Sequence, residues 1–469
     1  MARIETDLCV IGAGSGGLSV AAGAVQMGAR VVLVEGAEMG GDCLNHGCVP
    51  SKALLAAAKA AHAMTAGAAL GVAPTVPAVD FGAVKDHVAR VIASIAPVDS
   101  QERFEELGVR VIRAWGRFIS PTELQAGEDV IMARRFVIAT GSRPAVPPVP
   151  GLNEVRYLTN ETIFPLREKP EHLVILGGGP IGMEMAQAHR RLGCKVTVIE
   201  AASALGREDP EMAAVVLASL RDEGVTILEG VSAMRVDAPA TVTLSDGSRI
   251  AGSHLLVAVG RQVALERLNL DAAGVAHDRR GVTVGANLRS TNTHVYAVGD
   301  AAGGAQFTHL AGYHAGIVLR QVLFGLPAKA SMAAIPRVTF TDPELAQVGM
   351  TEADARAIPG ASVEVLRWPY ADNDRAQATG ETTGLVKLVI VRGRPVGVGI
   401  VGAQAGELIG LWALVISAGV KLRSVAGMVA PYPTLGEVSK RAAGAYFSPR
   451  LFDSALVKRA VRLVQRFLP

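Results

Sequence analysis

Cysteine, aromatic side chains and a surplus of either charge are all scarce in this chain of 469 residues. Four cysteines are too few for a disulfide scaffold at this length, and aromatic residues at 4% offer little surface for base stacking. The formal net charge of +3 provides no overall field to hold a nucleic acid, so we expect no nucleic-acid partner. With 50% hydrophobic residues and 52 glycines, the composition favours a folded protein of α/β layers joined by glycine turns.

The sequence also lacks a convincing membrane-spanning run. The uncharged stretch between Asp7 and Arg30 contains six glycines and follows acidic residues, where a signal peptide would be basic. The next candidate, Leu408–Val420, has 13 residues and is too short to cross a bilayer. We therefore expect no transmembrane span, no export signal and a cytoplasmic localisation.

A glycine-rich turn between two apolar segments predicts a dinucleotide-binding βαβ unit near the N-terminus. Gly12, Gly14 and Gly17 follow one apolar segment, and Glu35 ends the next. In such a unit the first glycine allows a tight turn, the second lets a pyrophosphate approach the backbone, and the third lets helix and strand pack closely. Glu35 would then bind the ribose hydroxyls.

The same pattern recurs in the middle of the chain. Gly177, Gly179 and Gly182 precede an apolar segment that ends in Glu200, and the first glycine and the acidic residue are 23 positions apart in both copies. Two dinucleotide sites in one chain indicate FAD together with a nicotinamide nucleotide. Because Glu200 would repel a 2′-phosphate, the pattern favours NADH, with NADPH as the alternative that nearby Arg207 leaves open.

Cys43 and Cys48 lie five positions apart in a glycine-rich segment. An ideal helix would hold their Cα atoms roughly 8 to 9 Å apart, beyond the usual disulfide limit of about 7 Å, so a bridge requires a distorted turn. A strained bridge is easily reduced, as a catalytic disulfide should be. The alternatives are a zinc site with His46 as a third ligand and a pair of buried structural cysteines.

Further motifs accompany these features: Ala139–Pro144, Val259–Arg261, Tyr296–Asp300 and Pro336–Pro343. Together with the two fingerprints and the cysteine segment, they resemble the pyridine nucleotide-disulfide oxidoreductases over nearly the whole chain. That family includes dihydrolipoamide dehydrogenase, glutathione reductase and mercuric reductase. The resemblance implies an α/β fold with two Rossmann-like dinucleotide-binding domains, for FAD and NAD(P), and a C-terminal α+β dimerisation domain in a homodimer. The implied parts are an FAD domain at 1–145 and 265–334, an NAD(P) domain at 146–264, a dimerisation domain at 335–447 and a tail at 448–469.

The resemblance also implies a route for electrons, from the nicotinamide to FAD and on to a Cys43–Cys48 disulfide. By the family's pattern, Cys48 is the thiolate that faces the flavin and Cys43 the thiol that attacks the substrate. Lys52 would pair with Glu184 beside the flavin, and Asp300 would hold an FAD hydroxyl. The other cofactor-binding residues that the motifs imply are Gly41, Thr140, Gly141, Gly260, Arg261 and Gly299.

The sequence departs from the lipoamide and glutathione reductases near its C-terminus. Those enzymes carry a His-Pro dipeptide there, followed by a glutamate, whereas here Tyr432 precedes Pro433 and Glu437 remains. A phenol with a pKa of about 10 is a poorer proton acceptor than an imidazole near 6.5, which argues against efficient lipoamide turnover. Tyrosine in this region is similar to mercuric reductase-like members, although their C-terminal cysteine pair is missing because no cysteine follows Cys194. Tyr432 would contact the substrate, with Glu437 beside it as a further catalytic residue; packing at the interface is the alternative role for Tyr432.

We therefore expect an NAD(P)H-dependent flavoprotein that reduces a disulfide or a thiol-bound soft metal ion such as Hg(II) or Cu(II), because thiolates prefer soft ions. Any metal would be a substrate held by Cys43 and Cys48, not a structural ion. The alternatives are a dihydrolipoyl dehydrogenase with an atypical active site, an NAD(P)H:quinone diaphorase, and a redox-sensing or metal-binding module without enzymatic activity.

The last segment of the chain has the pattern of a basic amphipathic helix. Beyond Asp453, apolar residues recur at helical spacing and four basic residues occupy another face. Such a helix can associate weakly with an anionic membrane surface or bind a partner. Packing on its own protein is the commoner outcome. The apolar positions are Leu456, Val457, Ala460, Val461, Val464, Phe467 and Leu468, and the basic ones are Lys458, Arg459, Arg462 and Arg466.

Overall fold

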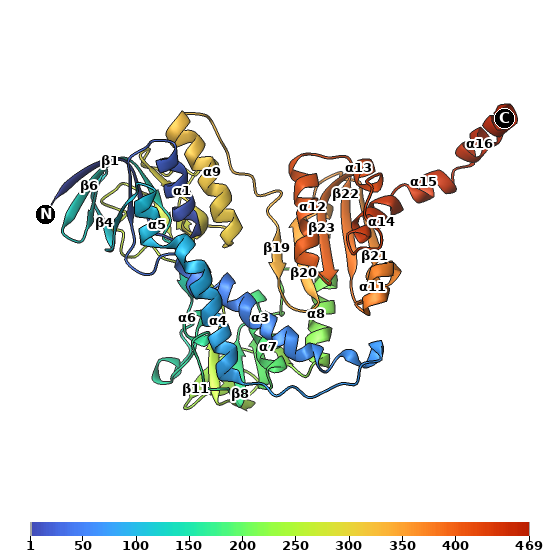
Figure 1. Cartoon of the computed structure of the whole chain (residues 1–469), viewed down its shortest axis with the longest axis horizontal. Coiled ribbons are helices and arrows are strands. Elements are labelled where there is room, and N and C mark those ends of the chain that lie inside the picture. Colours follow the sequence, from blue (N-terminus) through green and yellow to red (C-terminus); the bar gives the residue numbers. More distant parts are fainter. Residues whose placement is uncertain (1, 469) are drawn as a thin grey trace. The chain divides into compact units, whose positions relative to one another are not determined.

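The computed structural model describes residues 2–468, which contain helices and strands in a mixed α/β order (Figure 1). The chain forms two compact units, each built from several segments. The first unit contains residues 1–63, 76–201 and 226–331, and the second contains residues 64–75, 202–225 and 332–469.

The first sheet of the first unit has seven strands, in the order β3-β2-β1-β6-β5-β4 with β18 pairing to β6. Strands β1, β2, β3, β6 and β18 run parallel. The apolar side chains of β1, β2 and β18 are buried on both faces, as expected for a covered parallel sheet, whereas those of the edge strand β3 are half-buried. Helices α1 (Ser15–Gln26) and α9 (Thr308–Phe324) pack against each other over this sheet. The strands are β1 Arg3–Ile11, β2 Val31–Val34, β3 Arg110–Ile112, β4 Gly116–Ser120, β5 Glu123–Ala126, β6 Asp129–Ile138 and β18 Val295–Ala297.

The second sheet of this unit is fully parallel, in the order β10-β9-β8-β14. It carries the second glycine fingerprint between β8 (His172–Leu176) and α7 (Pro180–Arg191). Its other strands are β9 Lys195–Glu200, β10 Thr226–Glu229 and β14 His254–Val257. A separate three-stranded antiparallel sheet contains β11 Ala233–Asp237, β12 Thr241–Leu244 and β13 Arg249–Ala251. Two further pairs of strands complete the unit: β7 Ser142–Pro144 with β15 Arg261–Val263, and β16 His277–Asp278 with β17 Gly281–Val282. The remaining α-helices are α2 Gly41–Asn45, α3 Cys48–Ala63, α4 Phe81–Ile95, α5 Gln101–Glu106 and α6 Asn160–Ile163.

The second unit is built on a five-stranded antiparallel sheet, in the order β19-β20-β23-β22-β21. Its core holds two large polar aromatics whose polar atoms are satisfied: Trp412 donates to Ser439, and Tyr370 donates to the Ala403 carbonyl. The strands are β19 Arg337–Thr339, β20 Glu344–Gly349, β21 Val363–Pro369, β22 Leu385–Val391 and β23 Arg394–Gly402. The helices are α8 Pro210–Asp222, α10 Glu352–Arg356, α11 Asp374–Thr379, α12 Ala405–Ser417, α13 Leu422–Ala426, α14 Glu437–Ala445, α15 Ser448–Phe452 and α16 Ala455–Phe467.

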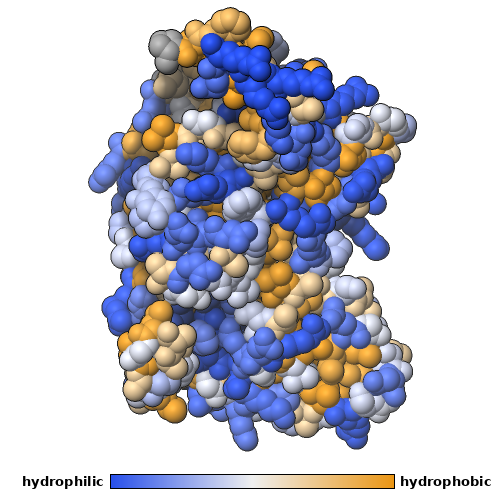
Figure 2. Space-filling model, turned by 90° about the vertical axis from the view of Figure 1, so that its right-hand side faces the viewer, coloured by the Kyte–Doolittle hydropathy of each residue, from blue (hydrophilic) through white to orange (hydrophobic). Residues whose placement is uncertain are grey.

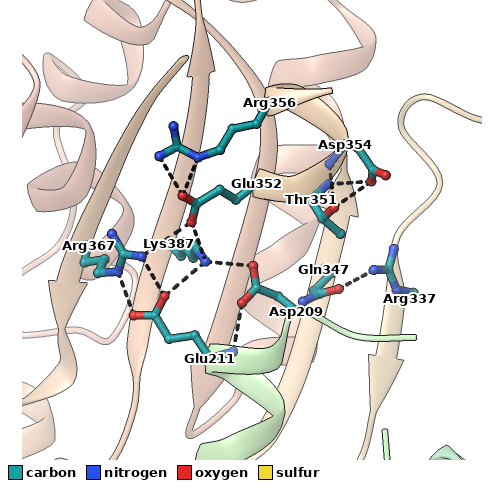
Figure 3. Close-up of polar contacts among 10 residues, drawn as sticks. All are labelled: Asp209, Glu211, Arg337, Gln347, Thr351, Glu352, Asp354, Arg356, Arg367 and Lys387. Atoms are coloured by element: carbon teal, nitrogen blue, oxygen red, sulfur yellow. Dashed lines mark hydrogen bonds and ion pairs between the residues drawn. The ribbon is translucent and has the colours of Figure 1, made fainter. Parts of the chain in front are cut away.

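A buried ion cluster attaches α8 to this sheet (Figure 3). The Lys387 Nζ of β22 lies 2.8 Å from Asp209, 3.0 Å from Glu211 and 2.9 Å from Glu352, and the Lys387 side chain is only 6% exposed. Asp209 also caps α8 by accepting from the Glu211 amide at 3.0 Å, and Arg367 of β21 binds Glu211 with two donors. Although α8 falls within the segment expected for the NAD(P) domain, it therefore belongs to the compact unit of the C-terminal sheet.

The fold class expected from the sequence is confirmed: two parallel-sheet dinucleotide-binding folds precede a C-terminal α+β sheet. The finer domain boundaries stay a prediction. The apolar run Leu408–Val420 lies largely in α12, which buries one face through Ile409, Trp412 and Val415. Among residues 2–468, no helix has the length and apolarity needed to cross a bilayer.

Candidate active site

Two glycines of the first fingerprint are required by the backbone, and the third leaves open space beside it. Gly12 has a φ of +106°, and an added Cβ would lie 2.4 Å from the Ala139 carbonyl oxygen. A Cβ on Gly17 would lie 1.8 Å from the Gly12 carbonyl oxygen, so only glycine lets α1 approach the turn. By contrast, the nearest atom to a Cβ on Gly14 is the Gly41 Cα, 4.0 Å away. Gly14 therefore leaves the backbone accessible without being needed for the turn.

The second fingerprint repeats these relations in the other parallel sheet. Gly177 has a φ of +108°, and its Cβ would lie 2.4 Å from the Ala258 carbonyl oxygen. A Cβ on Gly182 would lie 2.0 Å from the Gly177 carbonyl oxygen, whereas one on Gly179 would meet no atom within 4 Å. The two loops thus have the same form, with an open middle glycine at the start of a helix.

The acidic residues that follow each fingerprint lie against their glycine loops. Glu35, buried at the end of β2, accepts from the Ala13 and Ala37 amides, both at 2.6 Å. Glu200, at the end of β9, accepts from the Gly178 amide at 2.7 Å. These carboxylates therefore lie where the ribose of a bound dinucleotide is recognised in this type of fold.

The first loop has features that fit FAD. The hydroxyl of Thr140 is buried and has no hydrogen-bond partner among residues 2–468, which leaves a polar group for a ligand. Gly141 has a φ of +66°, and Gly299 a φ of +59° with its amide donating to His314 at 3.2 Å. The open cradle at Gly14, the unsatisfied Thr140 and the Glu35 carboxylate would hold the pyrophosphate and ribose of FAD, and Gly179 with Glu200 would hold those of a nicotinamide nucleotide.

The cysteines lie on two different helices. Cys43 is in α2, Cys48 begins α3, and the chain turns between them at His46 and Gly47, with a φ of −138° at His46. A Cβ on Gly47 would lie 2.8 Å from an Asp42 carboxylate oxygen, which explains the glycine. The distorted turn required for a bridge is therefore present, and in this structure both thiols are free.

The two thiols differ sharply in acidity. The pKa of Cys48 falls to about 6 because Cys43 and Thr308 hydrogen bond to it and the Lys52 charge lies nearby. Its Sγ lies 3.3 Å from the Thr308 hydroxyl. The pKa of Cys43 is raised by its hydrogen bond to Cys48 and by burial. Cys48 also begins a helix, where the positive end of the helix dipole favours a thiolate. The two opposite shifts make Cys48 the more acidic thiol of the pair.

Lys52 lies one turn after Cys48 on α3. Its Nζ lies 2.8 Å from a Glu184 oxygen of α7, and Glu184 is almost buried while Lys52 is partly exposed. Because the carboxylate holds the ammonium group, Lys52 keeps a fixed positive charge beside the Cys48 thiolate.

A second polar network joins α2, through Asp42, to four other segments of the chain. Arg261 of β15 lies 3.1 Å from Asp42 and donates to the Ser142 hydroxyl at 2.7 Å. Ser142 in turn donates to Asp300 at 2.5 Å, and burial raises the pKa of Asp300. Asn160 donates to Asp42 at 2.9 Å. The network therefore holds Arg261 and Asp300 in place, and it brings the predicted Gly260–Arg261 and Gly299–Asp300 motifs close to the cysteines.

Sequence reasoning missed Thr308, Asp42 and Asn160 as site residues. Thr308 lies 260 positions after Cys48, and only its place at the start of a helix distinguishes it. Asp42 stands next to Cys43 in the sequence, but its partners Asn160 and Arg261 come from α6 and β15, far along the chain. The zinc alternative gains no support: His46 faces Glu38 at 3.4 Å, and residues 2–468 contain no cluster of three His, Cys, Asp or Glu side chains suited to a metal.

Tyr432 and Glu437 lie in the other compact unit. Tyr432 is 68% exposed and donates to Asp374 at 3.0 Å, a hydrogen bond that raises the pKa of the phenol above its ordinary value. Glu437 is buried at the start of α14. A proton-accepting role for Tyr432 is therefore even less favourable than the sequence indicated, and its contact with the substrate stays a prediction.

Comparison with known proteins gives a consistent picture. Residues 6–315 match the family described as "Pyridine nucleotide-disulphide oxidoreductase", and residues 335–443 match its dimerisation domain, which indicates a homodimer. The chain is 35% identical to a mercuric reductase of Streptomyces lividans over 94% of this chain and 96% of that protein. It is 32% identical to a dihydrolipoyl dehydrogenase of Bacillus subtilis over 92% of this chain and 96% of that protein.

Two bacterial proteins are among the solved structures with the same fold. One is a Cu(II) complex of the HOCl-induced flavoprotein disulfide reductase RclA from Escherichia coli, with a TM-score of 0.83, 30% identity and coverage of 93% of this chain and 99% of that one. The other is LpdA from Mycobacterium tuberculosis, with a TM-score of 0.86, 25% identity and coverage of 95% and 100%.

Proposed function

Because the chain belongs to the pyridine nucleotide-disulphide oxidoreductases and is a flavin-dependent enzyme of that family, we propose that it reduces a disulfide or a thiol-bound soft metal ion such as Hg(II) or Cu(II). Its electrons come from NADH, with NADPH as the alternative, and pass through Cys43 and Cys48. FAD, when bound, would supply two-electron redox chemistry between the nicotinamide and the disulfide, and Gly14, Glu35 and Thr140 would hold it.

The observation that carries this proposal is the opposite shift of the two cysteine pKa values. A dithiol that reduces another disulfide needs one sulfur that stays a thiolate near the cofactor and another that can attack the substrate. Cys48, with a pKa of about 6, meets the first need. Cys43, hydrogen-bonded to Cys48 and less acidic, meets the second once a base or the metal takes its proton.

The cysteine pair carries two electrons and one proton between the cofactor and the substrate. Two electrons and one proton convert the Cys43–Cys48 disulfide into a Cys48 thiolate and a Cys43 thiol. Lys52, held by Glu184, stabilises the negative charge that accumulates at Cys48. When the pair becomes a disulfide again, its two electrons and the Cys43 proton, with one further proton from water, reduce one substrate disulfide to two thiols. With a metal, the two electrons reduce one Hg(II) to Hg(0) or two Cu(II) to two Cu(I), and the Cys43 proton is released to water.

Tyr432 favours a metal over lipoamide as the electron acceptor. Exchange between a dithiol and a disulfide requires a group that accepts a thiol proton, and a phenol with a raised pKa is a poor one at neutral pH. A metal ion bound by two thiolates displaces the protons itself, because thiolates are strong ligands for soft ions. The similarity to mercuric reductases and to a reductase solved with Cu(II) supports this choice.

Steady-state oxidation of NADH by the FAD-loaded enzyme tests the proposal. The acceptors are Hg(II) with excess thiol, Cu(II), oxidised glutathione, lipoamide and a quinone, each assayed with wild type and with Cys43→Ser. We expect turnover with Hg(II) or Cu(II) that is lost in Cys43→Ser, while quinone reduction survives.

Two outcomes would contradict the proposal. Fast lipoamide turnover would favour a dihydrolipoyl dehydrogenase, as in the Bacillus subtilis relative, and would refute the argument from Tyr432. Quinone reduction alone, unchanged in Cys43→Ser, would favour a diaphorase.

A further inference from the structure

Helix α16 (Ala455–Phe467) has no part in the redox chemistry and packs on no part of its own unit. None of its 13 residues is buried, and Leu456 and Phe467 are 76% and 79% exposed. Figure 1 shows it beyond α15, away from the C-terminal sheet. The match to the dimerisation domain ends at residue 443, before this helix begins. The expectation that the helix packs on its own protein is therefore wrong for its own unit.

The helix has two opposite faces. At 100° per residue, its large apolar side chains fall within a continuous arc of about 160°, and its basic side chains lie on the other side. No acidic residue occurs between Ser454 and Leu468. Ser454 caps the helix by accepting from the Val457 amide at 3.3 Å. The exposed apolar side chains are Leu456, Val461, Leu463, Val464, Phe467 and Leu468, and the basic ones are Lys458, Arg459, Arg462 and Arg466.

The apolar surface continues into the preceding helix. Leu451 and Phe452 of α15 are 51% and 69% exposed. In Figure 2, hydrophobic and hydrophilic residues lie side by side at the top of the molecule, where this segment is found. So large an exposed apolar arc is unusual in a protein that meets only water, and it calls for a covering surface.

The basic side chains of α16 indicate which kind of surface would cover its apolar face. A second copy of the helix would bring four more cations and no anion, so pairing of two copies would have no complementary charges around its apolar seam. An anionic lipid surface offers both components: an apolar layer for the wide arc and phosphate groups for the lysine and arginines that flank it.

We propose that α16 binds the surface of an anionic lipid membrane, lying parallel to it with Leu456, Val464 and Phe467 among the inserted side chains. Lys458, Arg459, Arg462 and Arg466 then contact the lipid phosphates. The helix has only 13 residues and is therefore a surface anchor, too short to span the bilayer. The proposal does not depend on which acceptor the cysteines reduce.

Vesicle co-sedimentation of the FAD-loaded full chain tests this proposal. The vesicles contain either phosphatidylcholine alone or phosphatidylcholine with phosphatidylglycerol. The variants are a chain ending at Asp453, Val464→Glu on the apolar face and Arg462→Glu on the basic face. Val464→Leu and Arg462→Lys are conservative controls. Lys59→Glu makes the same charge change at an exposed position outside the tail.

We expect the wild type to sediment with the anionic vesicles at least tenfold more than with phosphatidylcholine alone, and less as salt rises. The truncation, Val464→Glu and Arg462→Glu should each lose most of this binding, while the three controls keep it. FAD content and NADH turnover should be equal in all variants, which separates loss of binding from misfolding. Binding that is absent in the wild type, or unchanged by truncation, would overturn the proposal. So would a tail-dependent assembly larger than a dimer without lipid, which would identify a second copy as the partner.

Discussion

At the scale of single residues, the acidity of Cys48 depends on groups supplied by distant parts of the chain. Among these groups, the Thr308 hydroxyl can be removed with the least disturbance to the site, because valine has nearly the same shape as threonine. We expect Thr308→Val to raise the pKa of Cys48 from about 6 by about one unit, since a hydrogen bond to a charged group is lost. The pH dependence of thiolate absorbance in the reduced enzyme measures this shift.

Thr308→Ser is the matched control, because it keeps the hydroxyl. The explanation fails if Cys48 has the same pKa in Thr308→Val as in the wild type. It also fails if Thr308→Ser raises the pKa of Cys48 as much as Thr308→Val does.

Glu200 provides a second test at this scale. Its carboxylate lies beside the Gly178 amide, where it would face the 2′ position of a bound nicotinamide nucleotide. We expect Glu200→Ser to improve the ratio of kcat/KM for NADPH to that for NADH by about tenfold, because a repulsion worth roughly 1.4 kcal/mol disappears. Glu229→Ser, at the end of the neighbouring β10, is the control and should leave the ratio unchanged.

At the scale of elements, the ion cluster around Lys387 holds α8 on the C-terminal sheet (Figure 3). Lys387→Met would leave Asp209, Glu211 and Glu352 around an apolar side chain. We expect a loss of about 3–5 kcal/mol in the free energy of unfolding, the usual effect of removing one partner from a buried ion pair. Chemical denaturation measures it, and exposed Lys421→Met should change stability by less than about 0.5 kcal/mol.

The same cluster predicts a loss of stability in acid. Hydrogen bonds from Lys387 and Arg356 hold the pKa of Glu352 below its ordinary value of 4.5, and Arg367 does the same for Glu211. The folded protein therefore binds these protons less readily than the unfolded chain. The contribution is complete above about pH 4.5 and disappears as pH falls through the lower folded pKa values. Glu352→Gln should flatten the dependence of the unfolding midpoint on pH in this range; an unchanged slope would contradict the assignment.

At the scale of the whole molecule, the tail contributes nothing to the buried core. A chain ending at Asp453 should sediment as the same dimer as the full chain, because the match to the dimerisation domain ends at residue 443. Its melting temperature should differ by less than about 2 °C, since no residue of α16 is buried. A truncated monomer, or a larger drop in melting temperature, would show that the tail stabilises the assembly.

The sequence was most informative where a backbone conformation demands one residue type. Gly12, Gly17, Gly177 and Gly182 were predicted with their reasons because any side chain there would strike a carbonyl group. Thr308 could not be found in this way, because any hydroxyl at the start of any helix looks the same until the fold brings it to Cys48. The grouping of α8 with the C-terminal sheet was hidden for a similar reason: it depends on charges that meet only after folding.

The position of α8 in the chain has a consequence for synthesis on the ribosome. Lys387 follows Asp209 by 178 positions, so at roughly 5–20 residues per second α8 emerges about 10–35 seconds before its partner. During that interval its acidic N-terminus has no cation from β22, and its apolar face has no sheet to cover it. The nascent chain thus carries an incomplete C-terminal unit while the first dinucleotide fold can already form. During this interval the exposed apolar face of α8 would be a binding site for a chaperone.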